Sequence, residues 1–244
     1  MEKSRSAPRR GYGQYCALAK ALDVIGDRWT LLIVRELLLR GPCRYTDIRA
    51  GLPGVATNLL ADRLKELEQA GLMTREVAPP PIAATLLRLT PRGEELRGVV
   101  QAVGRWGGTL LGEVDKDDAF CSHWLALPLE MHLEDRHPDR APISIEVRTG
   151  DHPIVVETIG GNVRARPGRS DRPDAVLSGP PHLVLRVLLG KLTIAAATRQ
   201  GVHYEGTAAT LRRLQPVREE RPATSAPPGS SRRSRRASAS RALR

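Results

Sequence analysis

The sequence predicts an α+β protein with helices and a hairpin in its first half and strands followed by helices in its second. Three observations in residues 44–97 carry the first part of this prediction. Helical segments beginning at Arg44 and Thr57 flank a Gly-Leu-Pro-Gly turn, Gly71-Leu72 ends the second segment, and a hairpin interrupted by prolines follows. Two short helices around a tight turn and then a β wing are the pattern of a winged helix-turn-helix, which offers one exposed helix to the DNA major groove.

Two further helices are expected before this motif. Residues 29–39 are apolar nearly all round, which predicts a buried central helix that Gly41-Pro42 ends. Apolar residues at helical spacing from Gln14 to Ile25 predict a first helix, which Gly26-Asp27 interrupts.

The segment from Thr57 to Ala70 is the candidate recognition helix. At about 100° per residue, three leucines form a narrow buried arc: Leu60, Leu64 and Leu67. Arg63 lies on the flank, and the opposite face carries Asn58, Ala61, Asp62 and Lys65. Ala56 lacks the side-chain acceptor that usually precedes a helix, so Thr57 is expected to cap it instead, and Gly71 to cap the C-terminus.

Residues 73–77 and 84–89 are the expected strands of the wing. Pro79–Pro81 between them cannot join a ladder and should form a stiff, exposed loop. From Pro91, one helix is expected to carry apolar residues at helical spacing: Leu96, Val99, Val100, Val103, Trp106 and Leu110.

The pattern changes after a predicted boundary at Asp115–Asp118. Residues 120–133 are expected to be helical, and Ile143, Ile145 and Val147 alternate with polar residues as in a half-buried strand. Gly160-Gly161 suits a tight hairpin. The remaining expected strands are 154–158, 162–166, 174–178 and 202–205, and the remaining expected helices are 182–189, 192–198 and 207–214.

The net charge of +11 is concentrated at the two ends of the chain. Residues 1–10 carry four basic and one acidic side chain, and residues 217–244 carry eight and two. Residues 11–115 and 116–216 each carry 13 basic and 12 acidic side chains. DNA contact by the folded part must therefore come from local placement of charge, and the arginine-rich tail is expected to add weak, salt-sensitive DNA affinity.

Several classes of protein are disfavoured by composition. No apolar run approaches the ~20 residues needed to span a bilayer, and Met1–Arg10 lacks the apolar core of a secretory signal. Three cysteines without metal-ligand spacing suggest a reducing compartment. We therefore expect a cytoplasmic protein with no membrane association, no metal and no other cofactor, and no catalytic constellation indicates an enzyme.

Four regions are expected along the chain. They are a disordered basic N-terminus (1–12), a winged helix-turn-helix for DNA binding and dimerisation (13–115), a smaller α+β domain (118–215) and a disordered Arg/Ser-rich tail (216–244).

Several blocks of residues 14–110 resemble HxlR-type bacterial transcriptional regulators. The blocks are Tyr15–Thr30, Arg44–Ile48, Gly51–Gly54, the Leu60 to Leu72 spacing with Arg63, and Leu89–Gly93. The resemblance implies a homodimeric winged-helix repressor or activator whose first and last helices form the dimer interface. The chain departs from the family at Ala56, and at Leu86 and Leu87, where an aromatic is common.

Residues 118–215 are similar to sterol carrier protein 2-like domains. The similarity rests on Ala175–Gly179, Leu188–Lys191 and Val202–Gly206. It implies a pocket for a small apolar effector, for which the candidate lining residues are Trp124, Ile145, Val156, Leu177, Leu185, Leu188 and Ile194. The alternative for each of these residues is plain core.

The candidate DNA contacts cluster on the recognition helix and beside it. Asn58 could pair with adenine, and Lys65 could reach guanine or a phosphate. Arginines on the flanks could position the protein on the backbone. The full set is Arg44, Thr57, Asn58, Ala61, Arg63, Lys65 and Arg75. The alternative is an ordinary solvated helix face with Asp62 and Lys65 paired.

Cys16 occupies the position of an N-terminal cysteine through which some members of the resembled family sense oxidants. A sensor needs an exposed thiol of low pKa, and the alternative is a small buried residue in the dimer helix. Cys43 and Cys121 are interpreted as structural.

Two functions of different classes follow. The first is a sequence-specific regulator that binds double-stranded DNA as a homodimer and responds to a small apolar ligand. The second is a lipid or small-molecule binding module whose helical domain serves dimerisation, an alternative that the near-neutral charge of residues 11–115 keeps open.

Overall fold

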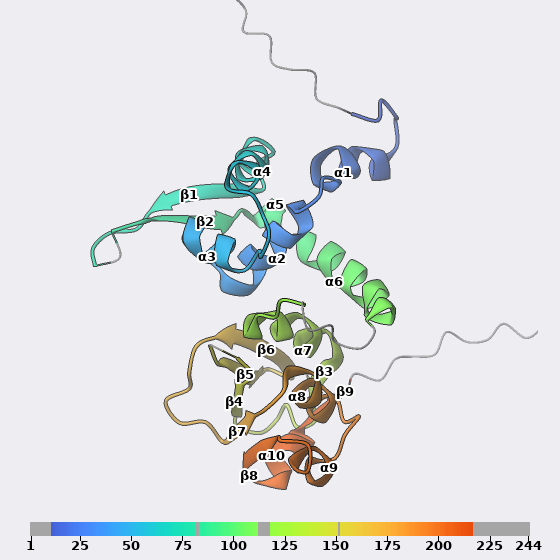
Figure 1. The fold of residues 1–244 in the computed structure, drawn as a ribbon, viewed down its shortest axis with the longest axis vertical. Helices are drawn as coiled ribbons and strands as arrows, with labels where there is room; N and C mark the ends of the chain where they lie inside the picture. Colours follow the sequence, from blue (N-terminus) through green and yellow to red (C-terminus); the bar gives the residue numbers. More distant parts are fainter. Residues whose placement is uncertain (1–10, 82, 112–117, 151, 217–244) are drawn as a thin grey trace, which may run out of the picture.

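The computed structural model describes residues 11–81, 83–111, 118–150 and 152–216. A helical lobe with a protruding hairpin lies above a lobe built on a sheet (Figure 1). The elements of the helical lobe are α1 (Ala17–Ile25), α2 (Thr30–Arg40), α3 (Tyr45–Ala50), α4 (Thr57–Gln69), β1 (Met73–Val77), β2 (Thr85–Leu89), α5 (Pro91–Glu94), α6 (Leu96–Gly107) and the 3₁₀ turn η1 (Gly108–Leu110).

Helix α2 is the centre of the helical lobe, as its apolar sequence predicts. Its Ile33 and Val34 are wholly buried. The predicted leucine arc of α4 packs into the same core, with Leu60, Leu64 and Leu67 each at most 2% exposed. Helices α2 and α4 are thereby held against one apolar centre, so their mutual orientation is set by burial.

The two expected wing strands form an antiparallel pair, in which Met73 lies opposite Leu89 and Val77 opposite Thr85. A third segment joins it, because Cys43 and Leu87 exchange two backbone hydrogen bonds of 3.1 and 2.8 Å. Pro79–Pro81 lie outside the ladder and are exposed, as predicted. The bridge at Cys43 attaches the hairpin to the segment between α2 and α3, so its base is fixed to the motif.

The second lobe is a seven-stranded sheet with helices packed against it (Figure 1). The strand order is β8-β7-β4-β5-β6-β3-β9, in which β4 and β7 are parallel and the other neighbours are antiparallel. Its elements are η2 (Ser122–Leu125), α7 (Ala126–His132), β3 (Leu133–Asp135), β4 (Ser144–Arg148), β5 (Ile154–Ile159), β6 (Asn162–Pro167), β7 (Ala175–Ser178), α8 (Pro181–Leu188), α9 (Ile194–Thr198), β8 (His203–Gly206), α10 (Ala208–Arg213) and β9 (Leu214–Pro216).

Several expectations for the second lobe are met. The hairpin between β5 and β6 turns at Gly160 and Gly161, both at positive φ. Each predicted strand and each later helix is present, with ends displaced by one or two residues.

Other expectations are corrected. The predicted helix at 120–133 is divided into η2 and α7, and its last residue begins β3, which pairs with β9. Residue 216, expected in the tail, ends β9. Glu146, expected on a solvated face, is 2% exposed because Arg148 and the backbone N of Ser170 supply its hydrogen bonds.

The first and last helices of the helical lobe also differ from expectation. The first helix begins at Ala17 rather than near Gln14. The helix expected from Pro91 is divided at Glu95, between Gly93 and Gly98, and glycine weakens helix interiors. The described part of the chain does not include residues 115–117 of the predicted boundary at Asp115–Asp118, residues 1–10 or residues 217–244.

Candidate nucleic-acid interface

The outward face of α4 carries the side chains that the sequence predicted. Thr57, Asn58, Ala61 and Lys65 are all exposed, whereas the leucines on the other side are buried. Among the described residues Lys65 makes no ion pair with Asp62, so its ammonium group faces solvent. A polar face on a helix whose opposite face is seated in the core has the geometry needed to read a DNA groove.

The N-terminus of α4 is open. Ala56 occupies the N-cap position and no side chain caps the helix, so the expected cap by Thr57 is wrong. The first N–H groups of the helix therefore have no side-chain acceptor, and the positive end of the helix dipole faces outward. Helix N-termini of this kind bind phosphate groups. Tyr45 steadies this end, since its hydroxyl donates to the carbonyl of Thr57 at 3.1 Å.

Arg63 differs from the other predicted contacts. Its guanidinium pairs with Asp27 and Glu66, and its side chain is only 18% exposed. Asp27 lies in the turn between α1 and α2, so this pair braces α4 against the preceding helices. The position favours a structural role for Arg63 rather than a contact with phosphate.

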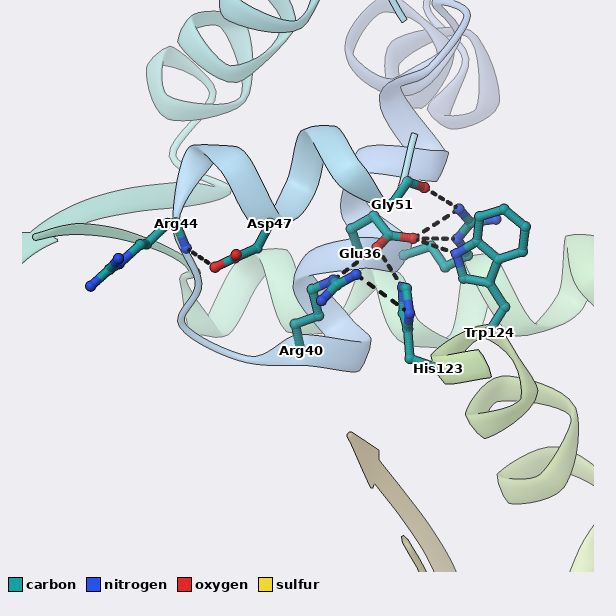
Figure 2. Close-up of polar contacts among 8 residues, drawn as sticks. Glu36, Arg40, Arg44, Asp47, Gly51, His123 and Trp124 are labelled. Carbon is teal, nitrogen blue, oxygen red and sulfur yellow. Dashed lines mark hydrogen bonds and ion pairs between the residues drawn. The ribbon is translucent and has the colours of Figure 1, made fainter. Parts of the chain in front are cut away.

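Two arginines flank α4. Arg44 is the N-cap residue of α3, and its exposed side chain extends away from the lobe (Figure 2). Arg75 lies on β1 and pairs with Glu68 across 3.0 Å, with both side chains about 40% exposed. Such exposed pairs are weak, so a phosphate can replace the glutamate at little cost.

A buried carboxylate that sequence reasoning missed joins the two lobes (Figure 2). Glu36 of α2 is wholly buried. Its Oε1 accepts hydrogen bonds from Arg35 and from Trp124 Nε1, the latter at 2.8 Å. Its Oε2 accepts from Arg40 at 3.1 Å and from His123 Nε2 at 2.6 Å. The signal was a glutamate in an otherwise apolar run, because a buried charge requires partners.

The protonation of this cluster follows from its geometry. Arg40 Nη2 lies 3.4 Å from His123 Nδ1, and an arginine can only donate, so the His123 proton is assigned to Nε2, which donates to Glu36. Burial alone would raise the pKa of Glu36. The hydrogen bonds from His123 and Arg40 and the positive charge of Arg35 together outweigh burial and hold that pKa below its usual value.

The same cluster contacts the helix-turn-helix directly. Arg35 also donates to the carbonyl of Gly51, at the end of α3, across 3.2 Å. A Cβ on Gly51 would lie 1.9 Å from the Glu36 carboxylate, so only glycine permits this approach. The guanidinium of Arg35 stacks over the Trp124 ring at 4.3 Å.

The seven apolar residues predicted to line a pocket all belong to the hydrophobic core or pack against it. Ile145, Val156 and Leu177 are at most 1% exposed and pack in the sheet core. Leu185, Leu188 and Ile194 belong to α8 and α9. Trp124 is partly buried against the same core and donates a hydrogen bond to Glu36.

The three cysteines occupy different environments. Cys16 is exposed and is the N-cap residue of α1. Cys43 is buried, and burial together with the nearby Asp47 carboxylate raises the pKa of its thiol to about 12. The interpretation of Cys43 as structural agrees with this burial and with its bridge to Leu87. Cys121 is half-buried.

Two kinds of feature are absent from the described residues. They contain no group of three or more His, Cys, Asp or Glu side chains that could hold a metal ion. None of the helices formed by them is long and apolar enough to cross a membrane.

Comparison with known proteins identifies the helical lobe. The sequence profile of HxlR-like helix-turn-helix proteins matches residues 24–115. The chain is 34% identical over 106 residues to the uncharacterized HTH-type transcriptional regulator YvaP of Bacillus subtilis, a match that covers 43% of this chain and 90% of YvaP. It is 35% identical over 89 residues to the HTH-type transcriptional regulator YodB of the same organism, covering 36% and 79%.

A solved structure described as the reduced form of YodB from B. subtilis also matches, with 32% identity, coverage of 42% of this chain and 100% of that one, and a TM-score of 0.36. The relatives are transcriptional regulators, and nothing in them points to catalysis. From the profile match and from the near-complete coverage of YvaP, the chain belongs to the HxlR-like helix-turn-helix family of transcriptional regulators.

Proposed function

We propose that this chain regulates transcription by binding a two-fold symmetric operator as a homodimer, with α4 of each protomer in the major groove. The exposed face of α4 carries the proposal. Asn58 presents an amide suited to adenine, and Lys65 presents a flexible cation seven residues further along the helix. Arg44, Arg75 and the open N-terminus of α4 lie on the flanks, where backbone phosphates would run.

Dimerisation is proposed through α1 and α6. These helices expose large apolar side chains to solvent, among them Leu18, Leu22, Val99, Val103 and Trp106. A groove of about 440 Å³ between α1, α2 and α6 is lined mainly by apolar residues. Contiguous apolar surface of this kind is what an interface between protomers would cover.

Selection from random duplex DNA at ~150 mM salt tests the DNA proposal. Excess non-specific competitor DNA is added so that it occupies the sequence-independent binding of the basic tail. We expect a palindromic motif to be enriched. Asn58→Ala should weaken operator binding by about 1–3 kcal/mol and relax one position, while Lys65→Ala should lower the salt slope by about one. Gln69→Ala, exposed at the end of the same helix, is the matched control. Unchanged affinity in both Asn58→Ala and Lys65→Ala would show that α4 is not the reading helix.

The oligomeric state is tested by light scattering of the full chain. Val103→Glu, on the exposed stripe of α6, is expected to yield monomers. Val77→Glu, which alters a still more exposed apolar residue on the wing, should leave the dimer intact. A monomeric wild-type chain would rule out the homodimer.

Two finer features are proposals that rest on the resemblances. A thiol response through Cys16 is supported by the exposure of that residue, and is tested by comparing operator binding of wild type and Cys16→Ser after diamide treatment.

An apolar effector in a sterol carrier protein 2-like second domain is tested with the neutral fluorophore diphenylhexatriene. Absence of saturable fluorescence would remove the apolar effector.

A further inference from the structure

A cavity of about 340 Å³ lies where the two lobes meet. Arg40, at the end of α2, contributes one wall, and His123 of η2 contributes another. The rest comes from the start of β5 and the end of β6, including His152 and Arg169. The two strands are held together here, since Ile154 pairs with Pro167 and Gly168 N donates to the Pro153 carbonyl at 3.0 Å. The cavity therefore has firm walls from both lobes.

The described side chains around this cavity carry excess positive charge. Two buried glutamates, Glu36 and Glu146, are each engaged by arginines. Of the residues that line the cavity itself, Arg40 and Arg169 are cationic and none is acidic. Arg169 is exposed, and its positive charge is close enough to Glu146 to help lower the pKa of that carboxyl. An arginine fork facing a cavity is suited to a carboxylate or a phosphate.

Unsatisfied hydroxyls occur at the same junction. Ser122 precedes His123, and Thr149 lies three residues before His152. Both residues are more than nine-tenths buried, and neither hydroxyl has a hydrogen-bond partner among the described residues. Leaving such a group without a partner is costly. Neither residue is among those that line the cavity, whose polar side chains come from Arg40, His123, His152 and Arg169.

The lining also fixes the size and character of the occupant. Pro153, Ile154 and Pro167 add apolar surface beside the cationic groups. The volume is at the lower end of the range of about 300–1,000 Å³ found for small-molecule sites. A compact molecule with one anionic group and an apolar body matches both kinds of lining.

We propose that this cavity binds a small organic anion, carrying a carboxylate or phosphate group, and that its occupancy alters the helix-turn-helix through Glu36. The coupling follows from shared residues. Arg40 and His123 line the cavity and also hold one oxygen of Glu36. The other oxygen is held by Arg35, which reaches the carbonyl of Gly51 at the end of α3. An anion that draws Arg40 away from Glu36 therefore disturbs a chain of contacts that runs through Glu36 and Arg35 to Gly51, in the turn that precedes α4.

The binding part of this proposal stands on the cavity alone, and the coupling part rests on the proposed DNA binding. Binding is measured by calorimetry on the full chain in low-chloride buffer, with benzoate and phenyl phosphate as probes and neutral benzamide as the uncharged match. We expect saturable binding of at least one anion, with a dissociation constant of about 1 mM or lower, and none of benzamide. Comparison of benzoate with phenyl phosphate shows which anionic group the site takes.

Arg169→Gln should weaken the binding of that probe by about tenfold or more, because a charge-assisted hydrogen bond is lost. Arg172→Gln, also exposed and three residues away but not lining the cavity, should bind as wild type does. Failure of both anions to saturate, equal binding of benzamide, or an Arg169→Gln variant that binds normally would each overturn the site.

Coupling is measured as operator affinity with and without the bound probe. We expect a change of about fivefold or more in the wild type and none in Arg169→Gln. If the probe binds but operator affinity does not change, the proposed coupling is overturned, whereas the proposed binding site stands. Binding of the probe by a chain that selects no DNA refutes the proposed function instead, so the two failures are distinguishable.

Discussion

Replacing Glu36 by glutamine is expected to lower the free energy of unfolding by about 2–4 kcal/mol. Glutamine keeps the shape of the side chain but presents one oxygen and one NH₂ group where the carboxylate presents two oxygens. Each carboxylate oxygen receives donors from two different side chains. Whichever way the amide is turned, its NH₂ group therefore meets N–H donors.

The magnitude follows from the less costly orientation. With NH₂ in the place of Oε2, His123 can change tautomer and accept, but Arg40 Nε loses its acceptor and the new proton on Nδ1 of the imidazole faces the arginine. Two charge-assisted contacts at about 1.5–3 kcal/mol each are affected. The side chains of Arg35 and Arg40 are 17% and 23% exposed, so partial hydration reduces the loss to the range above.

Urea denaturation followed by circular dichroism and tryptophan fluorescence measures this loss, since Trp124 reports directly on the cluster. Glu76→Gln is the control, because Glu76 pairs with Arg88 across 3.2 Å with both side chains more than half exposed, and it should cost less than about 1 kcal/mol. A Glu36→Gln variant as stable as this control would refute the view that Glu36 is a buried, ionised carboxylate that accepts hydrogen bonds from both lobes.

Three more predictions concern stability. Gly51→Ala should destabilise by about 1–3 kcal/mol, because its Cβ would meet the Glu36 carboxylate, whereas Gly98→Ala in open space on α6 should be neutral or stabilising in the same denaturation assay. Arg213→Lys should cost about 1–3 kcal/mol, since it loses one of two 2.8 Å hydrogen bonds to Asp135, and an unchanged midpoint would contradict this. Glu36 and Asp135 both have pKa values below their usual ones when folded, the latter through its hydrogen bond from Arg213, so their contribution is present above about pH 4.5 and is lost as pH falls through the folded values. Unfolding free energy measured from pH 7 to pH 3 should therefore fall below pH 4.5, and less steeply in Glu36→Gln.

The sequence by itself determined the elements whose signals are local. The leucines of α4 recur every three or four residues, so the buried face and the exposed face with Asn58 and Lys65 follow from helical geometry alone. Two glycines at 160–161 specify a tight hairpin because they accept positive φ. The blocks that resemble HxlR-type regulators lie within one continuous segment, so the family was also readable from them.

Only the tertiary structure decided which distant residues meet. Strands β3 and β9 are three residues each and pair across about 80 positions, too short and too far apart for any periodicity to show. The partners of Arg63 and Glu36 were hidden for the same reason, since Asp27, His123 and Trp124 lie outside the helices that carry them. The cationic cavity likewise exists only because the end of α2 comes to lie beside β5 and β6. Local periodicity dictates which face of a helix is buried, whereas long-range packing dictates what that face or its neighbours touch.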